Sequence, residues 1–410
     1  MHLKTARLFA AIAVISVASQ LAAFAEQKAN TNRLVVVGDS LAAGFQNFSL
    51  FDSSSQAGVP LGGQTQGLGA LIARQAGAPA TLPLISYPGI PPALELVGGT
   101  IQRAAGFGAR ENPGEQATIL AVPGFTLGDA LAHPFPGQPA TNAIDALADS
   151  ILGTPAGKTF GCGPLPAFNG YVVSEVACAA ALNAKTLIID IGNNDALQTL
   201  TLGAPPTDEK TFAAEFRLIM AALVHDHRAT VLVGNIPDVT VVPFLIPRGV
   251  FQVQCGFDPG ADYVVPNVIS PAPGPFNICQ KGDFSPRSQA QIDAAHAAVL
   301  AYNGIIAQQA AQFGATVVDV YGTLNAIAAH GYDAGGYHLT RAPVPCGGIF
   351  SLDSVHPTNT GYAILANAFI NVLNSKYKAG IPLVDVNATA ATDPLFPPNL
   401  GVPVTGCPTP

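Results

Sequence analysis

The amino-acid sequence predicts an α/β protein in which helices cover a parallel sheet. Five short runs rich in Val, Ile and Leu are apolar throughout, as strands buried on both faces are. Turn or polar residues end each run, and helical patterns separate the later runs. Because strands that alternate with helices form parallel sheets with right-handed crossovers, these observations together favour this fold class.

Each predicted strand is recognised by its apolar run and by the residues that end it. The first reads Leu-Val-Val-Val and stops at Gly38, the second stops at Pro123, and the third stops at Gly192. The last two are similar short runs of Val and Leu. The predicted strands are 34–37, 118–122, 186–191, 230–234 and 316–320.

Helical patterns lie mainly between and after the later strands, and one lies early in the chain. The predicted helices are 67–75, 211–225, 287–312, which is rich in alanine, and 359–378. Three long, loop-rich segments do not fit the minimal pattern: 45–117, 128–170 and 238–285. Loops of this length are usually functional, so we interpret them as insertions at one end of the sheet that shape the entrance to a site.

The first 25 residues predict an export signal. Lys4 and Arg7 supply its positive end, residues 8–21 are mostly apolar, and Ala23-Phe24-Ala25 has the small-x-small pattern of a cleavage site. The apolar part is shorter than a comfortable membrane span. We therefore expect a secreted or periplasmic protein with one domain, 26–378, followed by an extended tail, 379–410, rich in Pro and Thr.

The mature chain contains six cysteines, and an even number in an exported protein indicates up to three disulfides. Local pairing is the simplest prediction. It joins Cys162 with Cys178, Cys255 with Cys279, and Cys346 with Cys407. A metal site is the alternative, but the chain has no Cys-x-x-Cys pair and no His at ligand spacing from a Cys.

The charge balance restricts the kinds of partner. The net charge is -8 and only 11% of residues are charged, so the basic footprint of a nucleic-acid-binding protein is missing. Scarce charge would suit a lipid-like or acyl ligand and a transient lipid interface, but it also fits a secreted protein that is simply rich in Gly, Ala and Pro. Nothing in the composition implies an obligate protein partner.

Four places in the chain carry residues suited to chemistry. Three follow predicted strands: Gly38-Asp39-Ser40, Val122-Pro123-Gly124 and Gly192-Asn193-Asn194-Asp195; the fourth, Asp353-Ser354-Val355-His356-Pro357, precedes the last helix. Ligands bind beyond the carboxyl ends of the strands in an open parallel sheet. The first three places should therefore meet at one edge of the sheet, within reach of the fourth.

Residues at these places have the roles that a serine hydrolase requires. A serine hydroxyl such as that of Ser40 needs a base to take its proton, and histidine, here His356, is the side chain that most often serves as that base. Asp353, three residues earlier, would fix the tautomer of the ring and stabilise the imidazolium.

A tetrahedral intermediate also needs preorganised donors for its oxyanion. The backbone N–H of Ser40, the unshielded N–H of Gly124 and the side-chain amide of Asn194 are the candidates. Asn193 competes with Asn194 for this role, and Asp39 is expected to hydrogen-bond nearby backbone rather than to react.

The motifs "GDSL", "GNND" and "DSVHP", in this order, resemble those of the GDSL family of SGNH hydrolases. The resemblance spans residues 34 to about 375 and implies a flavodoxin-like three-layer α/β/α sandwich with a five-stranded parallel sheet. Position by position, it implies that Ser40 is the nucleophile, His356 the base, Asp353 its acid, and Gly124 and Asn194 the oxyanion donors beside the Ser40 N–H. It implies no cofactor and no metal.

The sequence thus predicts a secreted serine esterase or lipase that forms an acyl-enzyme on Ser40, with rather apolar esters as the favoured substrates. A carbohydrate O-acetyl esterase is one alternative, although the chain has no Trp and only 9 Tyr to line a sugar site. A non-catalytic secreted binding protein on the same fold is the other. The complete set of candidate residues argues against it.

Overall fold

The computed structural model describes residues 29–53, 62–135, 142–152, 165–167, 170–224, 229–267 and 277–401. The predicted signal, 1–25, lies outside the described residues, as do Cys162, Cys407 and the end of the predicted tail.

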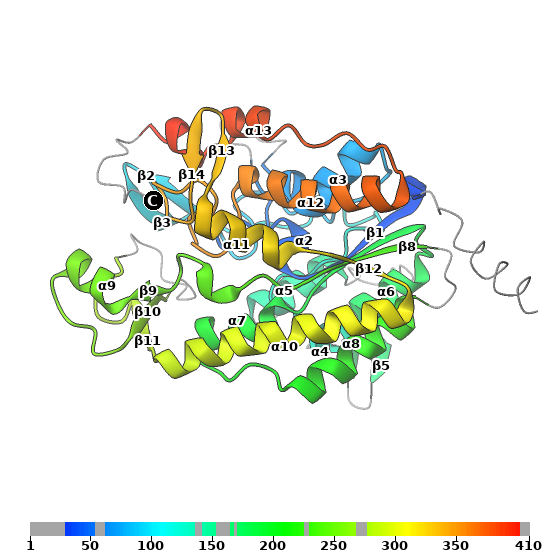
Figure 1. The fold of residues 1–410 in the computed structure, drawn as a ribbon, viewed down its shortest axis with the longest axis horizontal. Coiled ribbons are helices and arrows are strands. Elements are labelled where there is room, and N and C mark those ends of the chain that lie inside the picture. The colour runs from blue at the N-terminus through cyan, green and yellow to red at the C-terminus, as the bar shows by residue number, and fades with distance from the viewer. Residues whose placement is uncertain are drawn as a thin grey trace, which may run out of the picture.

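A parallel sheet forms the centre of the molecule (Figure 1). Its strands are β1 (Leu34–Gly38), β7 (Thr186–Asp190), β8 (Thr230–Gly234) and β12 (Thr316–Val318), in that spatial order, and every neighbouring pair is parallel. All residues of β1, β7 and β8 are buried, which explains why these strands are apolar throughout instead of alternating.

The segment 118–122, predicted as a strand, lies parallel to β1 at the edge of this sheet. Val36 N–H donates to the Thr118 carbonyl and the Val36 carbonyl accepts from Leu120 N–H, both at 2.9 Å, and Val122 N–H donates to the Gly38 carbonyl at 3.0 Å. The segment makes a short parallel bridge instead of a full strand, yet it occupies the fifth position. Counted along the chain, the order is 2-1-3-4-5, the flavodoxin-like arrangement.

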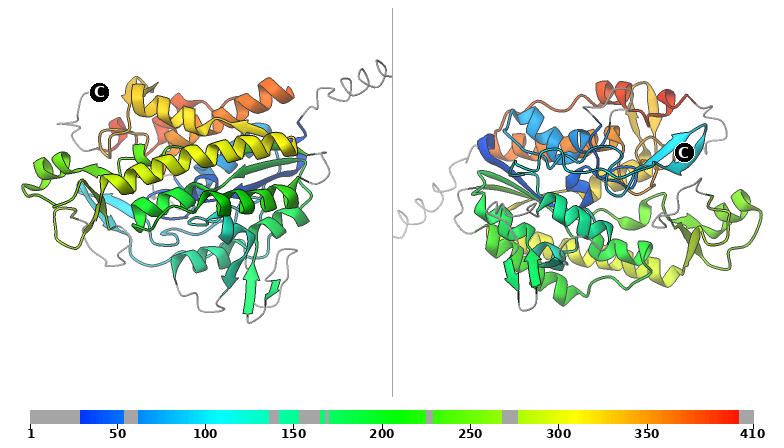
Figure 2. Two further views of the ribbon diagram at one scale, coloured as in Figure 1. Left: turned by 60° about the horizontal axis from the view of Figure 1, so that its bottom comes forward. Right: turned by 180° about the vertical axis from the view of Figure 1, so that it is seen from behind.

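Helices cover both faces of the sheet, which gives the predicted three layers (Figures 1 and 2). On one face lie α3 (Leu68–Ala76) and α12 (Asn359–Tyr377), with α11 (Val320–His330) and α13 (Val386–Thr392) beside α12. The other face carries α4 (Leu127–Leu131), α5 (Ala143–Ile151), α6 (Glu175–Ala181), α7 (Asn193–Thr201), α8 (Glu209–Leu223) and α10 (Gln289–Phe313). None of the described helices combines the length and apolar character that a bilayer crossing requires.

The four predicted helices are confirmed with boundaries shifted by one or two residues, and capping explains where they start and stop. Ser288 and Gln291 form a capping box at the start of α10, and Gly314, at φ 73°, ends this helix. The structure differs at the last strand, which ends at Val318 because Asp319 caps α11 by accepting from Gly322 N–H at 2.8 Å. Helix α11 was not predicted.

Outside the central sheet, in the loop-rich segments and beyond them, the chain forms small elements that the sequence did not predict. Two are hairpins, β2 (Leu94–Val97) with β3 (Thr100–Arg103) and β13 (Tyr332–Ala334) with β14 (Tyr337–Leu339). Two are three-stranded sheets, the first formed by β4 (His133–Phe135), β6 (Gly170–Val173) and β5 (Leu165–Ala167). The second comprises β11 (Phe284–Arg287), β10 (Tyr263–Pro266) and β9 (Ile246–Pro247), and with α9 (Arg248–Cys255) it makes a lobe that projects from one end of the molecule in Figure 1.

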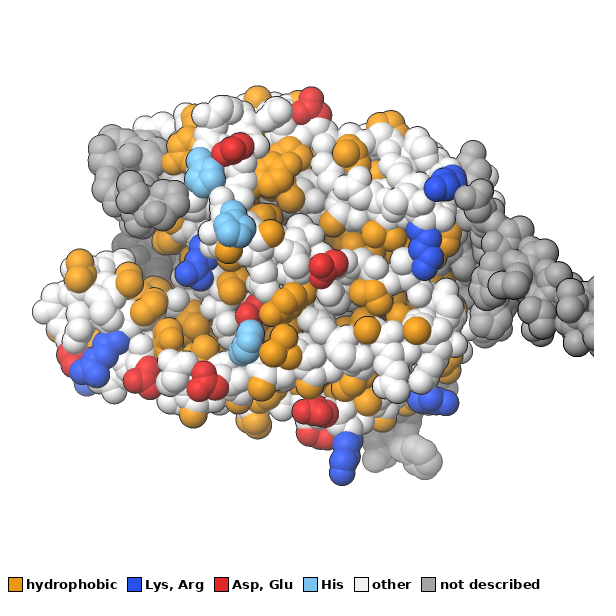
Figure 3. Space-filling model, viewed as in Figure 1, with side chains coloured by type: hydrophobic (Ala, Val, Ile, Leu, Met, Phe, Trp, Pro, Cys, Tyr) orange, Lys and Arg blue, Asp and Glu red, His pale blue; other side chains and the backbone are white. Residues whose placement is uncertain are grey.

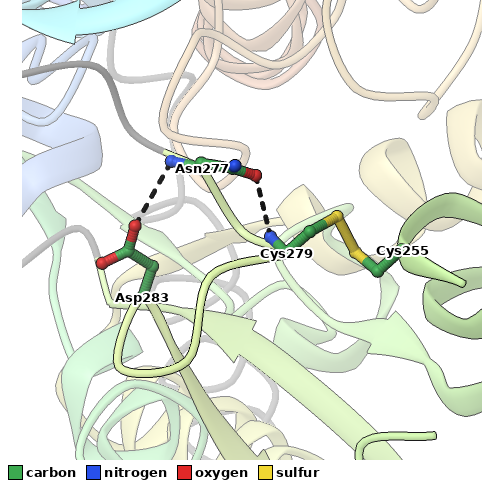
Figure 4. The surroundings of a disulfide bond; sticks show 4 residues. All are labelled: Cys255, Asn277, Cys279 and Asp283. Carbon is green, nitrogen blue, oxygen red and sulfur yellow. Dashed lines mark hydrogen bonds between the residues drawn. A yellow bond between two sulfur atoms is a disulfide. The ribbon is translucent and has the colours of Figure 1, made fainter. Parts of the chain in front are cut away.

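A disulfide between Cys255 and Cys279 closes this lobe, as the local pairing predicted (Figure 4). It ties the end of α9 to the loop before β11, where the Asn277 side chain accepts from Cys279 N–H at 3.0 Å. Cys178 and Cys346 are also disulfide-bonded. Their predicted partners lie outside the described residues, so those two pairings stay predictions.

Candidate active site

Ser40 stands at the point where β1 turns into a helix of one turn, α2 (Ser40–Ala43). Asp39 caps this helix by accepting from Leu41 N–H at 3.2 Å, and Gly44, at φ 79°, ends it. As the first residue of a helix, Ser40 has a backbone N–H without a partner inside the helix. Gly38 is required because a Cβ atom there would lie 2.4 Å from the Asp190 carbonyl oxygen of the neighbouring strand.

Asp39 also links the ends of the two central strands. Its carboxylate accepts from Asn193 N–H at 3.1 Å and from the Asn193 side-chain amide at 3.0 and 2.9 Å. Burial raises the pKa of Asp39 to about 6, although the hydrogen bonds from Asn193 and Leu41 act in the opposite direction. The predicted local backbone bond is present, but no pattern in the sequence pointed to the longer-range bonds to Asn193.

Gly124 lies in a tight turn at the end of the 118–122 segment. Phe125 N–H donates to the Val122 carbonyl at 3.2 Å, and Gly124 has φ 90°, which suits the third position of a type II turn and favours glycine there. The Asn194 side-chain amide donates to the Phe125 carbonyl at 2.9 Å. The structure therefore brings Gly124 and Asn194 together, and the amide of Asn194 retains one further N–H.

Asp353 and His356 lie in the loop before α12. One carboxylate oxygen, Oδ2, lies 3.0 Å from His356 Nδ1, and the other, Oδ1, accepts from the backbone N–H groups of Val355 and His356 at 2.8 Å each. Burial by itself would raise the pKa of Asp353. The charge of His356, its hydrogen bond and the two backbone N–H groups outweigh this effect and hold the pKa below its ordinary value.

Ser40 and His356 line the same pocket although they lie at opposite ends of the domain's sequence. Phe45 connects them, because its N–H donates to the Ser40 carbonyl at 3.0 Å and its ring packs against the His356 ring with centroids 4.7 Å apart. Among the described residues no hydrogen bond joins the Ser40 hydroxyl to the His356 ring, a bond that in many hydrolases tightens only with substrate bound. Asn193 is among the residues that line this pocket, whereas Asn194 and Gly124 are not.

The arrangement of strand ends, turn and loop matches a known family. A model of the family described as GDSL-like lipase/acylhydrolase matches residues 34–369. The chain belongs to this family. This GDSL-like hydrolase is accordingly an enzyme that acts on carboxylic esters, which confirms the predicted family and reaction class.

Comparison with solved structures gives similar chains of low identity. An acetylxylan esterase from Geobacillus stearothermophilus is 14% identical, with 86% of this chain and 98% of that chain covered and a TM-score of 0.38. An extracellular lipase from Streptomyces rimosus is 17% identical, with coverages of 84% and 98% and a TM-score of 0.32. An α/β hydrolase enzyme from the metagenome of Lake Arreo, Spain, is 13% identical, with coverages of 84% and 96% and a TM-score of 0.38. The comparison with curated proteins gave no match.

The pocket of the GDSL-like hydrolase is mostly apolar. Leu41 and Val355 flank the two candidate catalytic residues, and the start of the 238–285 segment supplies one wall. The apolar lining residues are Leu41, Leu197, Pro237, Val239, Val241, Val242, Leu324, Phe350, Val355 and Pro357. Charged side chains are also sparse on the outer surface seen in Figure 3.

Sequence reasoning missed the residues that support the candidate site from behind. Glu175, fully buried on α6, accepts from Gly38 N–H at 2.6 Å, and burial raises its pKa well above the ordinary value. Phe45 and Phe48 contact the Asp353–His356 loop from a segment interpreted only as an insertion. A buried acid in an apolar helix would have been a signal for Glu175, but no pattern in the sequence pointed to the two phenylalanines. In the described part of the chain, no three His, Cys, Asp or Glu side chains are grouped as metal ligands would be.

Proposed function

We propose that this GDSL-like hydrolase is a secreted serine esterase or lipase that cleaves esters through an acyl-enzyme on Ser40. The observation that carries the proposal is the arrangement of three side chains. Ser40 and His356 line the same pocket, and the Asp353 carboxylate is hydrogen-bonded to Nδ1 of the His356 ring. With Nδ1–H donated to a carboxylate, the other ring nitrogen, Nε2, carries the lone pair that a general base needs.

The reaction follows from this arrangement. His356 takes the proton of Ser40 as its oxygen attacks the ester carbonyl, and then gives that proton to the leaving alcohol. Water, activated by the same imidazole, attacks the acyl-enzyme, and the proton returns to Ser40 as the acid leaves. The backbone N–H groups of Ser40 and Gly124 and the second amide N–H of Asn194 are the proposed donors to the oxyanion.

The lining of the pocket supports an apolar acyl group as the preferred part of the substrate. Ten apolar residues surround the space beside Ser40 and His356. Transfer of a hydrocarbon chain from water to such a lining is favourable by about 0.8 kcal/mol for each buried methylene. Chain length should therefore raise kcat/KM until the pocket is filled.

Labelling with a fluorophosphonate tests the serine chemistry. The mature protein should react at Ser40, identified by mass spectrometry of the labelled peptide, and the His356→Ala variant should not react at a comparable rate. A protein that is folded but fails to react would favour the non-catalytic alternative.

A series of p-nitrophenyl esters of increasing acyl length tests the substrate class. Rising kcat/KM beyond acetate supports an apolar acyl group. Strict preference for acetyl groups, together with release of acetate from acetylated polysaccharide, would instead support the carbohydrate esterase.

Expression with residues 1–25 in a secreting host, followed by N-terminal sequencing, tests export, with a mature terminus expected near Glu26.

A further inference from the structure

A tight turn formed by residues Gln46 to Ser49, here called the 46–49 turn, has an unusual backbone. Gln46 and Ser49 exchange hydrogen bonds at 2.9 and 3.0 Å, and the two residues between them, Asn47 and Phe48, have φ 54° and φ 57°. Positive φ at both central positions defines a type I′ turn, in which Asn and Gly are favoured. Phenylalanine at φ 57° is a steric outlier, since bulky residues rarely adopt this conformation.

The 46–49 turn docks against the loop that carries Asp353 and His356. Asn47 N–H donates to the Ser351 hydroxyl at 3.0 Å, and the Asn47 side chain accepts from Leu352 N–H at 3.1 Å. Phe48 N–H donates to Asp353 Oδ2 at 2.6 Å across 305 positions of sequence. The side chain of Gln46 extends the contact to the start of α12, where it donates to the Asn359 side chain at 3.2 Å.

The unusual conformation explains how this contact arises. Gln46 and Ser49 bond to each other, so the N–H groups of the two central residues are left to bond outside the turn. Asn47 N–H donates to the Ser351 hydroxyl, and Phe48 N–H donates to Asp353 Oδ2, the oxygen that also faces His356 Nδ1. The donor on Phe48 therefore acts on the oxygen that orients the imidazole.

Aromatic contacts support the ring of His356 from the same segment. The Phe45 ring packs on the His356 ring, and the Phe48 ring meets Phe45 edge to face with centroids 6.1 Å apart. The guanidinium of Arg103, on β3, lies 5.3 Å from the centre of the Phe48 ring. Both partners of the Asp353–His356 pair thus contact residues 45–48.

We propose that the 46–49 turn is a positioning element for catalysis, in which the backbone N–H of Phe48 holds the Asp353 carboxylate in the orientation that His356 needs. This inference rests on the proposed serine esterase function. It assigns a purpose to the strained backbone at Phe48, because strain of this kind persists where the surrounding structure requires it.

Replacing the amide of Phe48 by an ester tests the donor alone. Phenyllactic acid incorporated at position 48 keeps the side chain and removes only the N–H. Loss of a hydrogen bond to a charged group should lower kcat about tenfold to a hundredfold. KM should stay within about twofold, since Phe48 does not line the pocket.

The matched control is the same replacement at Phe396, whose N–H donates to the Asp393 carbonyl at 3.1 Å in the C-terminal segment. It removes one backbone hydrogen bond elsewhere, so it should lower the melting temperature to a similar degree and leave kcat within about twofold.

The variant Phe48→Gly supplies a second test. It keeps the N–H and suits a positive φ, so its loss of kcat should be smaller than that of the ester.

The outcomes separate this inference from the function on which it rests. A fall in kcat with the ester at position 48, but not with Phe48→Gly or the Phe396 ester, supports the positioning role. Equal losses with the ester and with Phe48→Gly, or a loss with the ester no larger than that of the control, would overturn it. Full activity of Asp353→Ala and His356→Ala would instead overturn the proposed function itself.

Discussion

The two halves of the candidate site are held in place by different means. The candidate oxyanion half, with Gly124 and Asn194, sits at the ends of the two segments that flank β1, where a glycine turn and one side-chain hydrogen bond place the proposed donors. The base half, with Asp353 and His356, lies in a loop outside the sheet. There, backbone N–H groups of Val355, His356 and the distant Phe48 hold the carboxylate.

The difference teaches that the ends of sheet segments bring hydrogen-bond donors together with few further contacts, whereas a loop that carries catalytic residues needs contacts from a second segment to hold its conformation. Strand ends converge because the sheet forces them to. A loop has no such constraint, and here the 46–49 turn provides it. Substitutions in the two halves should therefore differ in size and in kind.

The largest effect is expected where the chemistry itself is removed. Ser40→Ala and His356→Ala should each lower kcat by about 10⁵ to 10⁶. Residues of a triad act as a unit, so removing one of them costs nearly as much catalysis as removing all of them. Steady-state kinetics with a p-nitrophenyl ester measure this. Ser375→Ala and His338→Ala, at exposed positions that do not line the pocket, are the matched controls and should keep full activity.

A smaller effect is expected for the residue that orients the base. Asp353→Ala should lower kcat by about 10³ to 10⁴, less than loss of either partner in proton transfer. The rate of fluorophosphonate labelling should fall in parallel, since it depends on the same activated serine. A loss below tenfold would mean that the contacts of Phe45 hold the ring without the carboxylate.

The oxyanion half should be less sensitive again. Asn194→Ala removes one donor and should lower kcat by about 10² to 10³ with little change in KM. Asn193→Ala breaks bonds to Asp39 instead, so its main effect should be a lower melting temperature. If Asn194→Ala loses less than tenfold and Asn193→Ala loses more, the donor is Asn193.

The last comparison concerns the free energy of unfolding instead of kcat, and the two halves should respond to pH in opposite ways. Burial raises the pKa of Asp190, beneath the oxyanion half, to about 8. The folded state then binds a proton that the unfolded state has lost, so stability should fall between about pH 4 and pH 8 by at most ~1.4 kcal/mol per pH unit from this group. The lowered pKa of Asp353 gives stability that is present above about pH 4 and lost as pH falls further.

Thermal melts followed by circular dichroism from pH 4 to pH 8 check this balance. The melting temperature should be highest at mildly acidic pH, and Asp190→Asn should flatten the decline toward pH 8. A melting temperature that rises steadily from pH 5 to pH 8 in the unaltered protein would contradict the prediction.

The fold and the candidate site were predictable to different degrees. Apolar runs that end in Gly and polar residues predicted the parallel sheet, because burial on both faces leaves no other pattern. The same strand ends pointed to Ser40, Gly124 and Asn194, whose catalytic roles stay predictions. Helix α11 was missed because its start depends on the capping geometry of Asp319, the residue directly after the strand.

The contacts of the 46–49 turn could not have been predicted. Local preferences disfavour φ 57° for phenylalanine, so sequence patterns argue against the turn that forms. Its hydrogen bond to Asp353 joins residues that only the completed fold brings together. The same holds for the bonds between Asp39 and Asn193, which cross from one strand end to the next.

The crowding around Gly38 bears on how this enzyme can be adapted to new esters. A side chain there would collide with the Asp190 carbonyl and with Ala42, each 2.4 Å from an added Cβ, and would push apart strands β1 and β7, after which Ser40 and the candidate donor Asn194 follow. Directed evolution should therefore leave position 38 untouched in every active clone. Changes of selectivity should accumulate instead at Val239, Val241 and Val242, a wall of the pocket that can be rebuilt without moving the sheet.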